Sequence, residues 1–158
     1  MRLLASTDYA LRVLMLFGRQ EAGRSLNVET IAKQLGGLSR NHLHKIVQEL
    51  AGLGLLRAVR GVGGGVFLAR PLAEVRLGWL VRKLESDQPL VECFREDGGC
   101  CVIDPGCRLR GMLRTAREAF YKSLDQHTLA DCAGGRWFSA IDKSSTGKDS
   151  KPDLERAT

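Results

Sequence analysis

The sequence predicts a mainly α-helical fold with one small β-hairpin and a long helix near its end. Apolar residues repeat at helical spacing in several segments, and a glycine-rich stretch separates two short runs typical of strands. The 158 residues suit one domain with an added arm, and the 44% hydrophobic content is enough for a core. We therefore expect helices to form the core and the hairpin to be an appendage.

Two helices are predicted at the start of the chain. The first covers residues 8–19, with Ser6 or Thr7 as its N-cap. The second is short, with Asn27 as its N-cap, and ends at the glycines of residues 36–37. Each carries an apolar stripe at helical spacing, formed in the first by Ala10, Val13, Leu14 and Phe17 and in the second by Val28, Ile31, Ala32 and Leu35.

A third helix follows Ser39, its predicted N-cap, and ends near Gly52 and Gly54. Two short helices joined by a few glycine-containing residues indicate a helix-turn-helix, although a plain helical hairpin would give the same pattern. The apolar stripe is formed by Leu43, Ile46, Val47 and Leu50. The opposite face carries side chains that donate to phosphates and base edges, namely Arg40, Asn41, His44, Lys45 and Gln48.

A β-hairpin is predicted directly after this helix, from residues 55–60 and 66–69. Its position makes it the wing of a winged helix-turn-helix. A glycine-rich loop can also cradle a nucleotide phosphate, but the Lys-Ser/Thr of a P-loop is missing here. Candidate contacts to phosphates or the minor groove lie on and beside the hairpin, at Arg57, Arg60, Gly63, Gly64 and Arg70.

Charge is distributed unevenly along the chain. Residues 1–70 hold 10 Lys/Arg and 4 Asp/Glu, a difference of +6, whereas residues 71–158 hold 14 of each. The first half therefore carries the whole formal excess of +6. This favours a polyanion as partner, although a solvated basic surface would look the same. The sequence shows no aromatic stacking platform of the kind that binds RNA, so we expect the partner to be double-stranded DNA.

The second half is predicted to hold a helix at residues 77–86, a loop at 87–106 and a long helix at 107–125. The apolar stripe of the long helix needs a cover, either its copy in a second subunit, giving a two-fold dimer, or the chain's own preceding helix. The stripe consists of Leu109, Met112, Leu113, Ala116, Phe120 and Leu124. The end of the chain is polar, and we predict that it is disordered.

Four of the five cysteines lie in the loop, at positions 93, 100, 101 and 107, whereas Cys132 lies apart. Thiolates select zinc, Cu(I) or iron–sulfur clusters. Cys107 opens the long helix, where the helix dipole favours a thiolate. The wide gaps disfavour a zinc finger without excluding zinc, and buried structural cysteines are the remaining alternative. The spacing predicts a metal or redox site and leaves the metal open.

Several ordered blocks together resemble the IscR/NsrR-type winged-helix regulators of bacteria, over the span from Met1 to about Cys132. The blocks are Thr-Asp-Tyr-Ala-Leu-Arg at 7–12, Leu-Ser-Arg-Asn-His-Leu at 38–43, Val-Arg-Gly-Val-Gly-Gly-Gly at 59–65, Leu-Val-Glu-Cys-Phe at 90–94, Cys-Val-Ile-Asp-Pro-Gly-Cys-Arg-Leu at 101–109 and Thr-Leu-Ala-Asp at 128–131. The Ser-Arg-Asn-His-Leu and Glu-Cys-Phe blocks are most similar to the nitric-oxide-sensing NsrR branch.

The resemblance implies a homodimeric repressor of a palindromic DNA operator, with an iron–sulfur cluster, [4Fe–4S] rather than [2Fe–2S], as sensor of nitric oxide. It implies Cys93, Cys101 and Cys107 as ligands, with Cys100 as a substitute and Asp8 of the partner subunit as the fourth. From the residues, Asp8 could equally be a first-turn carboxylate favoured by the helix dipole or the i+4 partner of Arg12. The DNA-contacting set would be Ser39, Arg40, Asn41, His42, His44, Lys45, Arg57, Arg60, Gly63 and Gly64.

Four regions follow: a DNA-binding domain at 1–71, a connecting helix with the cysteine loop at 72–107, a dimerisation helix at 108–132 and a tail at 133–158. No apolar run spans a bilayer and no secretory signal is evident, so we expect a cytoplasmic protein without membrane contact. The alternatives are a thiol- or zinc-based redox regulator and an iron–sulfur status sensor. An enzyme is not expected, because no nucleophile arrangement or substrate motif is present.

Overall fold

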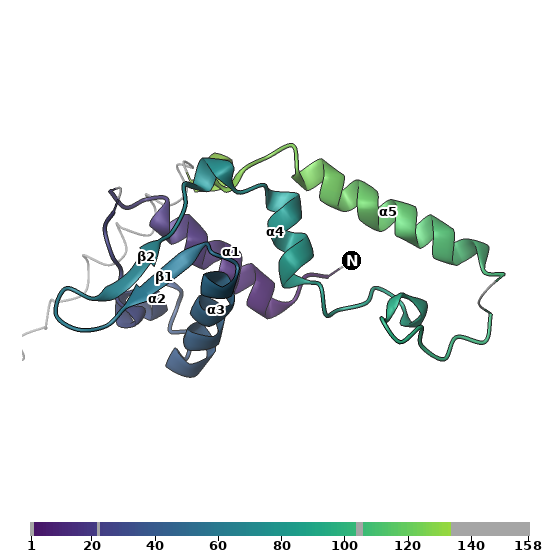
Figure 1. Ribbon diagram of the computed structural model, residues 1–158, viewed down its shortest axis with the longest axis horizontal. Helices are drawn as coiled ribbons and strands as arrows, with labels where there is room; N and C mark the ends of the chain where they lie inside the picture. The colour runs from purple at the N-terminus through teal and green to yellow at the C-terminus, as the bar shows by residue number, and fades with distance from the viewer. Residues whose placement is uncertain (1, 22, 104–105, 134–158) are drawn as a thin grey trace, which may run out of the picture.

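The computed structural model describes residues 2–21, 23–103 and 106–133, which form two regions (Figure 1). A helix-turn-helix half combines the first three helices with a two-stranded sheet. An arm extends from this half and consists of a fourth helix, the cysteine loop and a long fifth helix. The predicted fold class, mainly α with a small β-hairpin, is confirmed. The predicted tail lies almost wholly outside the described residues.

Helix α1 spans Ala5–Phe17 and begins earlier than predicted. The expected caps, Ser6 and Thr7, lie inside the helix, so that prediction was wrong. The N-cap is Leu4, which makes no side-chain cap hydrogen bond; its amide donates to Glu85 Oε1 at 2.9 Å. A carboxylate distant in sequence thus satisfies an amide at the helix start, a contact that no local pattern reveals.

Helix α2 spans Val28–Gln34 and has the predicted N-cap, because Asn27 Oδ1 accepts the Thr30 amide at 2.6 Å. The predicted glycine stop is also confirmed. Gly36 and Gly37 adopt φ values of 78° and 84°, which glycine reaches without a steric penalty. The chain can therefore reverse sharply before the next helix.

Helix α3 spans Arg40–Gly52 and is capped by Ser39, whose Oγ accepts the His42 amide at 3.3 Å. Its predicted stripe packs inward, and this amphipathic pattern fixes which face stays outside. The four buried residues are Leu43, Ile46, Val47 and Leu50.

Strands β1 (Leu56–Val59) and β2 (Gly65–Leu68) form the predicted antiparallel hairpin after α3. The sheet is tied to the helical half by a bridge between Leu26 and Val66, with amide–carbonyl distances of 2.9 Å in both directions. Val66 is buried and anchors the base of the hairpin, while its glycine-rich end extends away from the core.

The second half contains α4 (Leu77–Leu84) and α5 (Arg108–Leu124), both close to their predicted bounds. Three short elements were not predicted, because each has only three to five residues. They are the 3-10 helices η1 (Leu72–Glu74) and η2 (Glu92–Phe94) and the helix α6 (Leu129–Ala133). Residues 87–103 otherwise form the expected irregular loop.

The C-terminal end of α5 is fastened to the N-terminal end of α4. The Trp79 amide donates to Asp125 Oδ1 at 2.8 Å, so this carboxylate caps α4 from outside the helix. The Leu77 amide donates to the His127 carbonyl at 3.1 Å. A Cβ at Gly78 would collide with the backbone of α5, so glycine permits the close crossing.

The chain then returns to the helix-turn-helix half. The Leu129 amide donates to the Val75 carbonyl at 2.9 Å, and the Leu129 side chain is fully buried in the main core. Helix α6 packs against α1 and η1. The arm is therefore joined to this half before α4 and again after α5.

The apolar stripe predicted on α5 is divided between two faces. Leu113, Phe120 and Leu124 are half-buried, whereas Leu109 and Met112 are 58% and 64% exposed. The residue of α5 that is buried is Tyr121, which the predicted stripe did not include. Helix α5 therefore packs on α4 through one face and leaves an apolar face open. None of the described helices combines the length and apolarity that a membrane crossing requires.

Candidate nucleic-acid interface and cysteine loop

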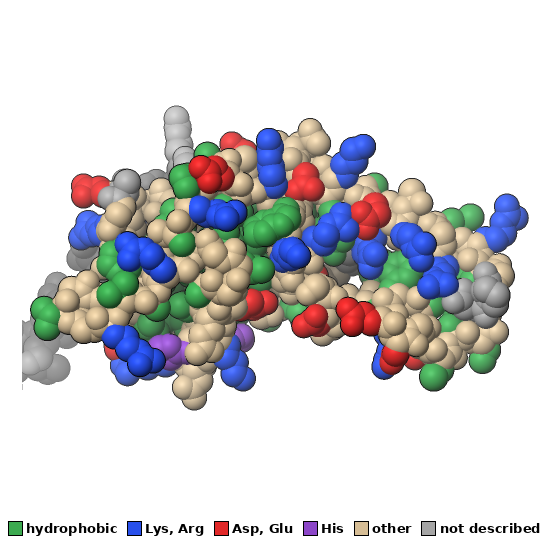
Figure 2. Space-filling view, viewed as in Figure 1, with side chains coloured by type: hydrophobic (Ala, Val, Ile, Leu, Met, Phe, Trp, Pro, Cys, Tyr) green, Lys and Arg blue, Asp and Glu red, His purple; other side chains and the backbone are tan. Residues whose placement is uncertain are grey.

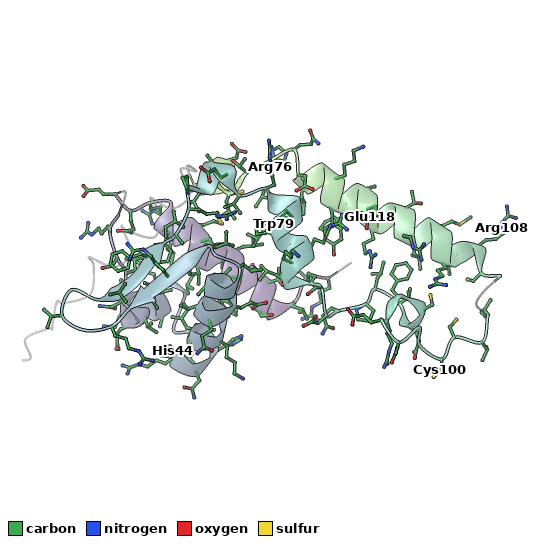
Figure 3. All side chains as sticks on the ribbon, viewed as in Figure 1. His44, Arg76, Trp79, Cys100, Arg108 and Glu118 are labelled. Carbon is green, nitrogen blue, oxygen red and sulfur yellow. The ribbon has the colours of Figure 1, made fainter. Side chains whose placement is uncertain are left out.

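The outer face of α3 carries an uninterrupted set of polar and basic side chains. Its N-terminal end is not covered by the hairpin or the arm (Figure 1). Figure 2 shows Lys and Arg side chains gathered around the histidines at this lower edge of the molecule, and Figure 3 places His44 on the outside of the helix. The exposed members are Arg40, Asn41, His44, Lys45 and Gln48.

Arg40, the first residue of α3, is bound to Glu29 in the first turn of α2. Its Nη2 donates to Glu29 Oε2, and the two groups form an ion pair. The guanidinium holds the pKa of the Glu29 carboxyl below its ordinary value, first through the hydrogen bond and then through its charge. A carboxylate therefore sits at the leading edge of an otherwise basic surface.

His42 is half-buried, unlike Ser39 and the other predicted contact residues of α3, because it turns back toward α1. Its ring meets the Tyr9 ring edge-on, with centroids 5.8 Å apart. The Arg12 guanidinium lies 5.8 Å from the centroid of the same Tyr9 ring. Arg12 also binds Asp8, with Nη2 to Oδ2 at 2.7 Å and Nε to Oδ1 at 3.0 Å. Asp8 is therefore connected through Arg12 and Tyr9 to His42 on α3.

The hairpin presents a glycine-rich tip. Gly61 and Gly63 adopt φ values of 97° and 76°, and a Cβ at Gly64 would collide with the backbone of the same turn. Val62 is fully exposed at the tip. The turn is therefore compact, with an open backbone. Arg57 and Arg60 are also exposed, and the Arg57 guanidinium stacks 4.2 Å from the centroid of Phe67.

The cysteines of the loop differ in exposure. Cys93 is buried within η2, Cys101 and Cys107 are half-buried, and Cys100 is exposed (Figure 3). Cys107 is the N-cap residue of α5 and makes no side-chain cap hydrogen bond. In residues 2–21, 23–103 and 106–133, no three Cys, His, Asp or Glu side chains lie close enough to hold a metal ion. The thiols share one loop but are not gathered at one point.

The first part of the loop is held by its own polar contacts. Asp97 receives Arg95 Nε at 3.0 Å and Nη2 at 2.8 Å, and its Oδ1 accepts the Gly99 amide at 3.0 Å. The Arg95 hydrogen bond is the largest cause that lowers the pKa of Asp97. Gly99 has φ 61°, and a Cβ there would collide with the Glu92 backbone. This turn brings Gly99 back against Glu92 in η2, the residue before Cys93.

Helix α5 contacts the loop through arginine and aromatic side chains. The Arg117 guanidinium lies 4.7 Å from the centroid of Phe94, the residue after Cys93. Arg117 Nε is buried without a hydrogen-bond partner, and Glu118 Oε1 is 3.8 Å away. Glu118 is itself engaged by Arg82 through contacts of 2.8 and 2.7 Å. A donor next to Phe94 therefore has no hydrogen-bond acceptor among the described residues.

The outer face of α5 is a shallow groove of about 670 Å³. Gly111, Thr115 and Ala119 are spaced four residues apart along it, so their small side chains leave the helix backbone accessible to another helix. Arg108, Met112 and Ala116 complete its lining. Two further apolar side chains, Val102 and Ile103, are exposed in the cysteine loop.

Cys132 lies in α6, away from the loop and next to the helix-turn-helix half. Its Sγ is 3.9 Å from the Thr128 carbonyl, and burial raises the pKa of its thiol. The neutral thiol form is therefore favoured there, as expected for a structural cysteine.

Several contacts of the site were not predicted from sequence: the Glu29–Arg40 pair, the Tyr9–His42 contact and the stacking of Arg117 on Phe94. Each joins residues from different helices or from a helix and the loop. Only the i+4 spacing of Asp8 and Arg12 was visible in the sequence, and the structure confirms that pair.

Comparison with known proteins places this geometry in context. The profile of the Rrf2 family, described as an iron-dependent transcriptional regulator, matches residues 3–134. A protein of Geobacillus kaustophilus named HTH-type transcriptional regulator NsrR is 45% identical over 131 residues, which are 83% of this chain and 88% of that protein. The protein of the same name from Bacillus subtilis is 39% identical over 83% of this chain and 89% of its own length.

Solved structures agree on the architecture. The oxidised form of CymR from Staphylococcus aureus superimposes with a TM-score of 0.64 at 25% identity, covering 85% of this chain and 98% of that one. A structure described as T. potens IscR gives a TM-score of 0.62, covers 96% of this chain and 94% of that one, and shares 19% identity. The latter supports the fold.

Proposed function

Because this chain belongs to the Rrf2 family of transcriptional regulators, we propose that it is a repressor whose hold on DNA is controlled by an iron–sulfur cluster that senses nitric oxide. It is a DNA-binding regulator and not an enzyme, in line with the names of its relatives. The observation that carries the proposal is the loop with four thiols, held against α5 at Phe94 and built into the arm of a helix-turn-helix protein.

On DNA, α3 enters the major groove and the hairpin lies along the adjacent backbone or minor groove. The exposed face of α3 offers donors for base edges and phosphates, while the glycine tip lets the backbone approach closely. The contacting residues would be Ser39, Arg40, Asn41, His42, His44, Lys45, Arg57, Arg60, Gly63 and Gly64. Of these, His42 would act mainly by orienting α3, because its ring faces Tyr9.

The loop fits a cluster by its donors and its surroundings. Cys93, Cys101 and Cys107 would supply thiolates, with Cys100 as substitute, and thiolates are the ligands that iron–sulfur clusters require. Cys107 opens a helix of 17 residues, where the dipole favours an anionic sulfur. The buried Arg117 Nε, which has no hydrogen-bond partner and lies on the helix face that contacts Phe94, would suit an anionic group held by this loop. We propose a cluster of the [4Fe–4S] type, in preference to [2Fe–2S].

The fourth ligand would be Asp8 of the partner subunit. In this chain the Asp8 carboxylate is bound by Arg12 and is 48% exposed, so it is accessible to a second molecule. Its contacts continue through Arg12 and Tyr9 to His42 on α3. Engagement of Asp8 would therefore alter an ion pair that is linked through Tyr9 to the DNA-reading helix.

The second molecule would be another copy of this chain, packed on the open face of α5. Leu109 and Met112 are largely exposed there, and the small residues of the groove let two helices approach closely. A two-fold pair of α5 helices makes the same patch meet itself, which is the commonest form of dimer. Two α3 helices in such a dimer match a palindromic operator.

The control would run through Asp8. A cluster held by Cys93, Cys101 and Cys107 would supply the iron that reacts with nitric oxide. While Asp8 is engaged by the partner's loop, the two DNA-reading halves keep a fixed separation. When it is released, the carboxylate returns to Arg12, the separation relaxes and the operator is lost. We propose that the protein works in the cytoplasm.

One experiment tests this function. The full chain, purified without oxygen, is analysed for iron and sulfide and by absorption spectrum, and the same sample is used in a mobility shift with a duplex selected from a random pool. We expect iron and sulfide together, a shifted duplex, and loss of both the spectrum and the shift after nitric oxide. Protein without iron, or binding that does not respond to nitric oxide, would refute the proposal.

The same samples separate the alternatives. A thiol- or zinc-based regulator would lack sulfide and would respond to oxidants or chelators. An iron–sulfur status sensor would lose DNA when iron is removed but would be no more sensitive to nitric oxide than to oxygen. Asp8→Ala is the specific variant: the cluster should remain, while its control over DNA should weaken.

A further inference from the structure

The ion pair between Glu29 and Arg40 lies at the place where a recognition helix meets base edges. Arg40 is the first residue of α3, and the N-terminal residues of such a helix reach furthest into the major groove. Glu29 comes from the neighbouring helix α2 and binds the Arg40 Nη2. Both helix starts are fixed by their own caps, Asn27 and Ser39, so the backbone on each side of the pair is held.

Stability does not account for this pair. The side chains of Arg40 and Glu29 are 68% and 53% exposed, and exposed ion pairs contribute little to folding. A cation at the N-terminus of a helix is also unfavourable with respect to the helix dipole. A carboxylate at a DNA-facing edge repels phosphates as well. The pair therefore gives little stability, and the place of Arg40 at the start of α3 and the repulsion between Glu29 and phosphates are both unfavourable, so the arrangement needs another reason.

An arginine without a partner at this edge would turn to the nearest phosphate, because that contact is available on every sequence. A carboxylate on one side of the guanidinium opposes that movement and leaves the remaining N–H groups for other acceptors. Guanine O6 and N7 match two parallel guanidinium donors, and this is the commonest specific contact of arginine with a base.

We propose that Glu29 is a positioning residue for sequence recognition, holding Arg40 so that it reads a guanine edge in preference to a phosphate. The inference rests on the proposed placement of α3 in the major groove. It adds a residue outside that helix to the determinants of specificity. Loss of the carboxylate should make the protein bind DNA in general more tightly and discriminate less.

The test compares two duplexes, one selected by the wild-type protein from a random pool and one with the same bases permuted. The protein is the full chain purified without oxygen. For Glu29→Gln we expect about tenfold loss of discrimination, mainly through tighter binding to the permuted duplex. The slope of log Kd against log salt should steepen by about 0.9, the value for one added phosphate contact. Glu49→Gln removes the same charge at the far end of α3 and should leave both quantities unchanged.

A double-mutant cycle gives the deciding result. In an Arg40→Ala background, Glu29→Gln should have no further effect on discrimination, because the positioned group is gone. Equal effects of Glu29→Gln in both backgrounds, or equal effects of Glu29→Gln and Glu49→Gln, would overturn the inference. If Arg40→Ala itself left binding to the selected duplex unchanged, the proposed interface would be wrong as well. Thermal unfolding and circular dichroism show that each variant is folded.

Discussion

The helix-turn-helix half and the arm bury apolar surface to very different degrees. The main core joins α1, α2, α3, both strands, η1 and α6 in one cluster, and of the arm it includes Leu80 and Leu84 of α4. In α5, Tyr121 is the buried residue, although this is the longest helix described. Conversely, the large exposed apolar side chains concentrate on the arm, at Leu90, Val102, Ile103, Leu109 and Met112, with Val59 and Val62 on the wing.

This difference separates a region that is complete within one chain from a region that is not. The helix-turn-helix half buries its apolar side chains within one chain, although Thr7 Oγ1 in α1 is also buried without a hydrogen-bond partner, so we expect its fold not to depend on a cofactor. The arm leaves an apolar helix face open, a buried Arg117 Nε without a hydrogen-bond partner and thiols that are not gathered together. It presents surfaces and donors for other molecules, which is where a signal can enter.

The largest expected effect comes from the arm. Cys93→Ser should abolish stable iron binding, because the proposed cluster would lose one of its ligands, while the far-ultraviolet circular dichroism should stay close to that of the wild-type protein. Iron and sulfide per chain, measured after anaerobic purification, check this prediction. Cys132→Ser is the matched control and should retain its iron. Equal iron loss in both variants would mean that the loop is not the cluster site.

The second prediction concerns the core of the helix-turn-helix half. Leu129→Ala removes a fully buried side chain from the main core and should lower the free energy of unfolding by about 2–5 kcal/mol. Chemical denaturation followed by circular dichroism measures it. Ala130 is exposed on the same short helix, and Ala130→Ser should have little effect. A small loss for Leu129→Ala would show that α6 is not part of the core.

The third prediction concerns the open face of α5. Met112→Glu places a charge in the groove and should weaken self-association by tenfold or more, about 1.4 kcal/mol, without lowering monomer stability. Analytical ultracentrifugation over a range of concentrations gives the dissociation constant. Lys122→Glu changes the charge of the same helix outside the groove and should leave self-association intact. A dimer unaffected by Met112→Glu would have to use another surface.

The smallest effect is expected where the two packed helices of the arm are joined. Arg82 holds the pKa of Glu118 below its ordinary value of 4.5, so the folded state favours the ionised carboxylate. The stabilisation is therefore present above pH 4.5 and is lost as the pH falls through the depressed pKa. Because both side chains are more than 40% exposed, Glu118→Gln should cost less than about 1 kcal/mol.

The pH dependence of that cost is the measurement. Unfolding free energies of wild type and Glu118→Gln should differ at neutral pH and converge in acid, below the depressed pKa of Glu118. A difference that stays constant from neutral pH to pH 3 would show that packing, and not the charge of Glu118, is responsible.

Local patterns predicted much of the fold. The caps Asn27 and Ser39, the turn at Gly36 and Gly37 and the bounds of α5 were all visible in the sequence, because each depends on neighbouring residues. The caps of α1 were predicted wrongly: the helix begins at Ala5, and the amide of its N-cap Leu4 donates to Glu85, a partner that is distant in sequence. Short elements such as α6 escaped because five residues carry almost no periodicity.

The site was predictable in composition more than in arrangement. The cysteines, the basic residues of α3 and the hairpin glycines could be listed from the sequence. Their contacts could not, because Glu29 with Arg40 and Phe94 with Arg117 join segments that only the tertiary structure brings together. The ligands of the proposed cluster, the DNA contacts and the division into four regions remain predictions.

The fastening of α5 at one end has a mechanical consequence. The capping of α4 by Asp125 and the burial of Leu129 make a pivot where α5 meets the helix-turn-helix half. From that pivot the helix reaches about 25 Å to Cys107 at 1.5 Å per residue. A tilt of about 5° there displaces the far tip by about 2 Å. A lever of this length converts a slight change in angle beside the DNA-reading half into a displacement of Cys107 comparable to the length of an iron–sulfur bond. Conversely, a displacement of that size at Cys107 would change the angle of α5 beside the DNA-reading half.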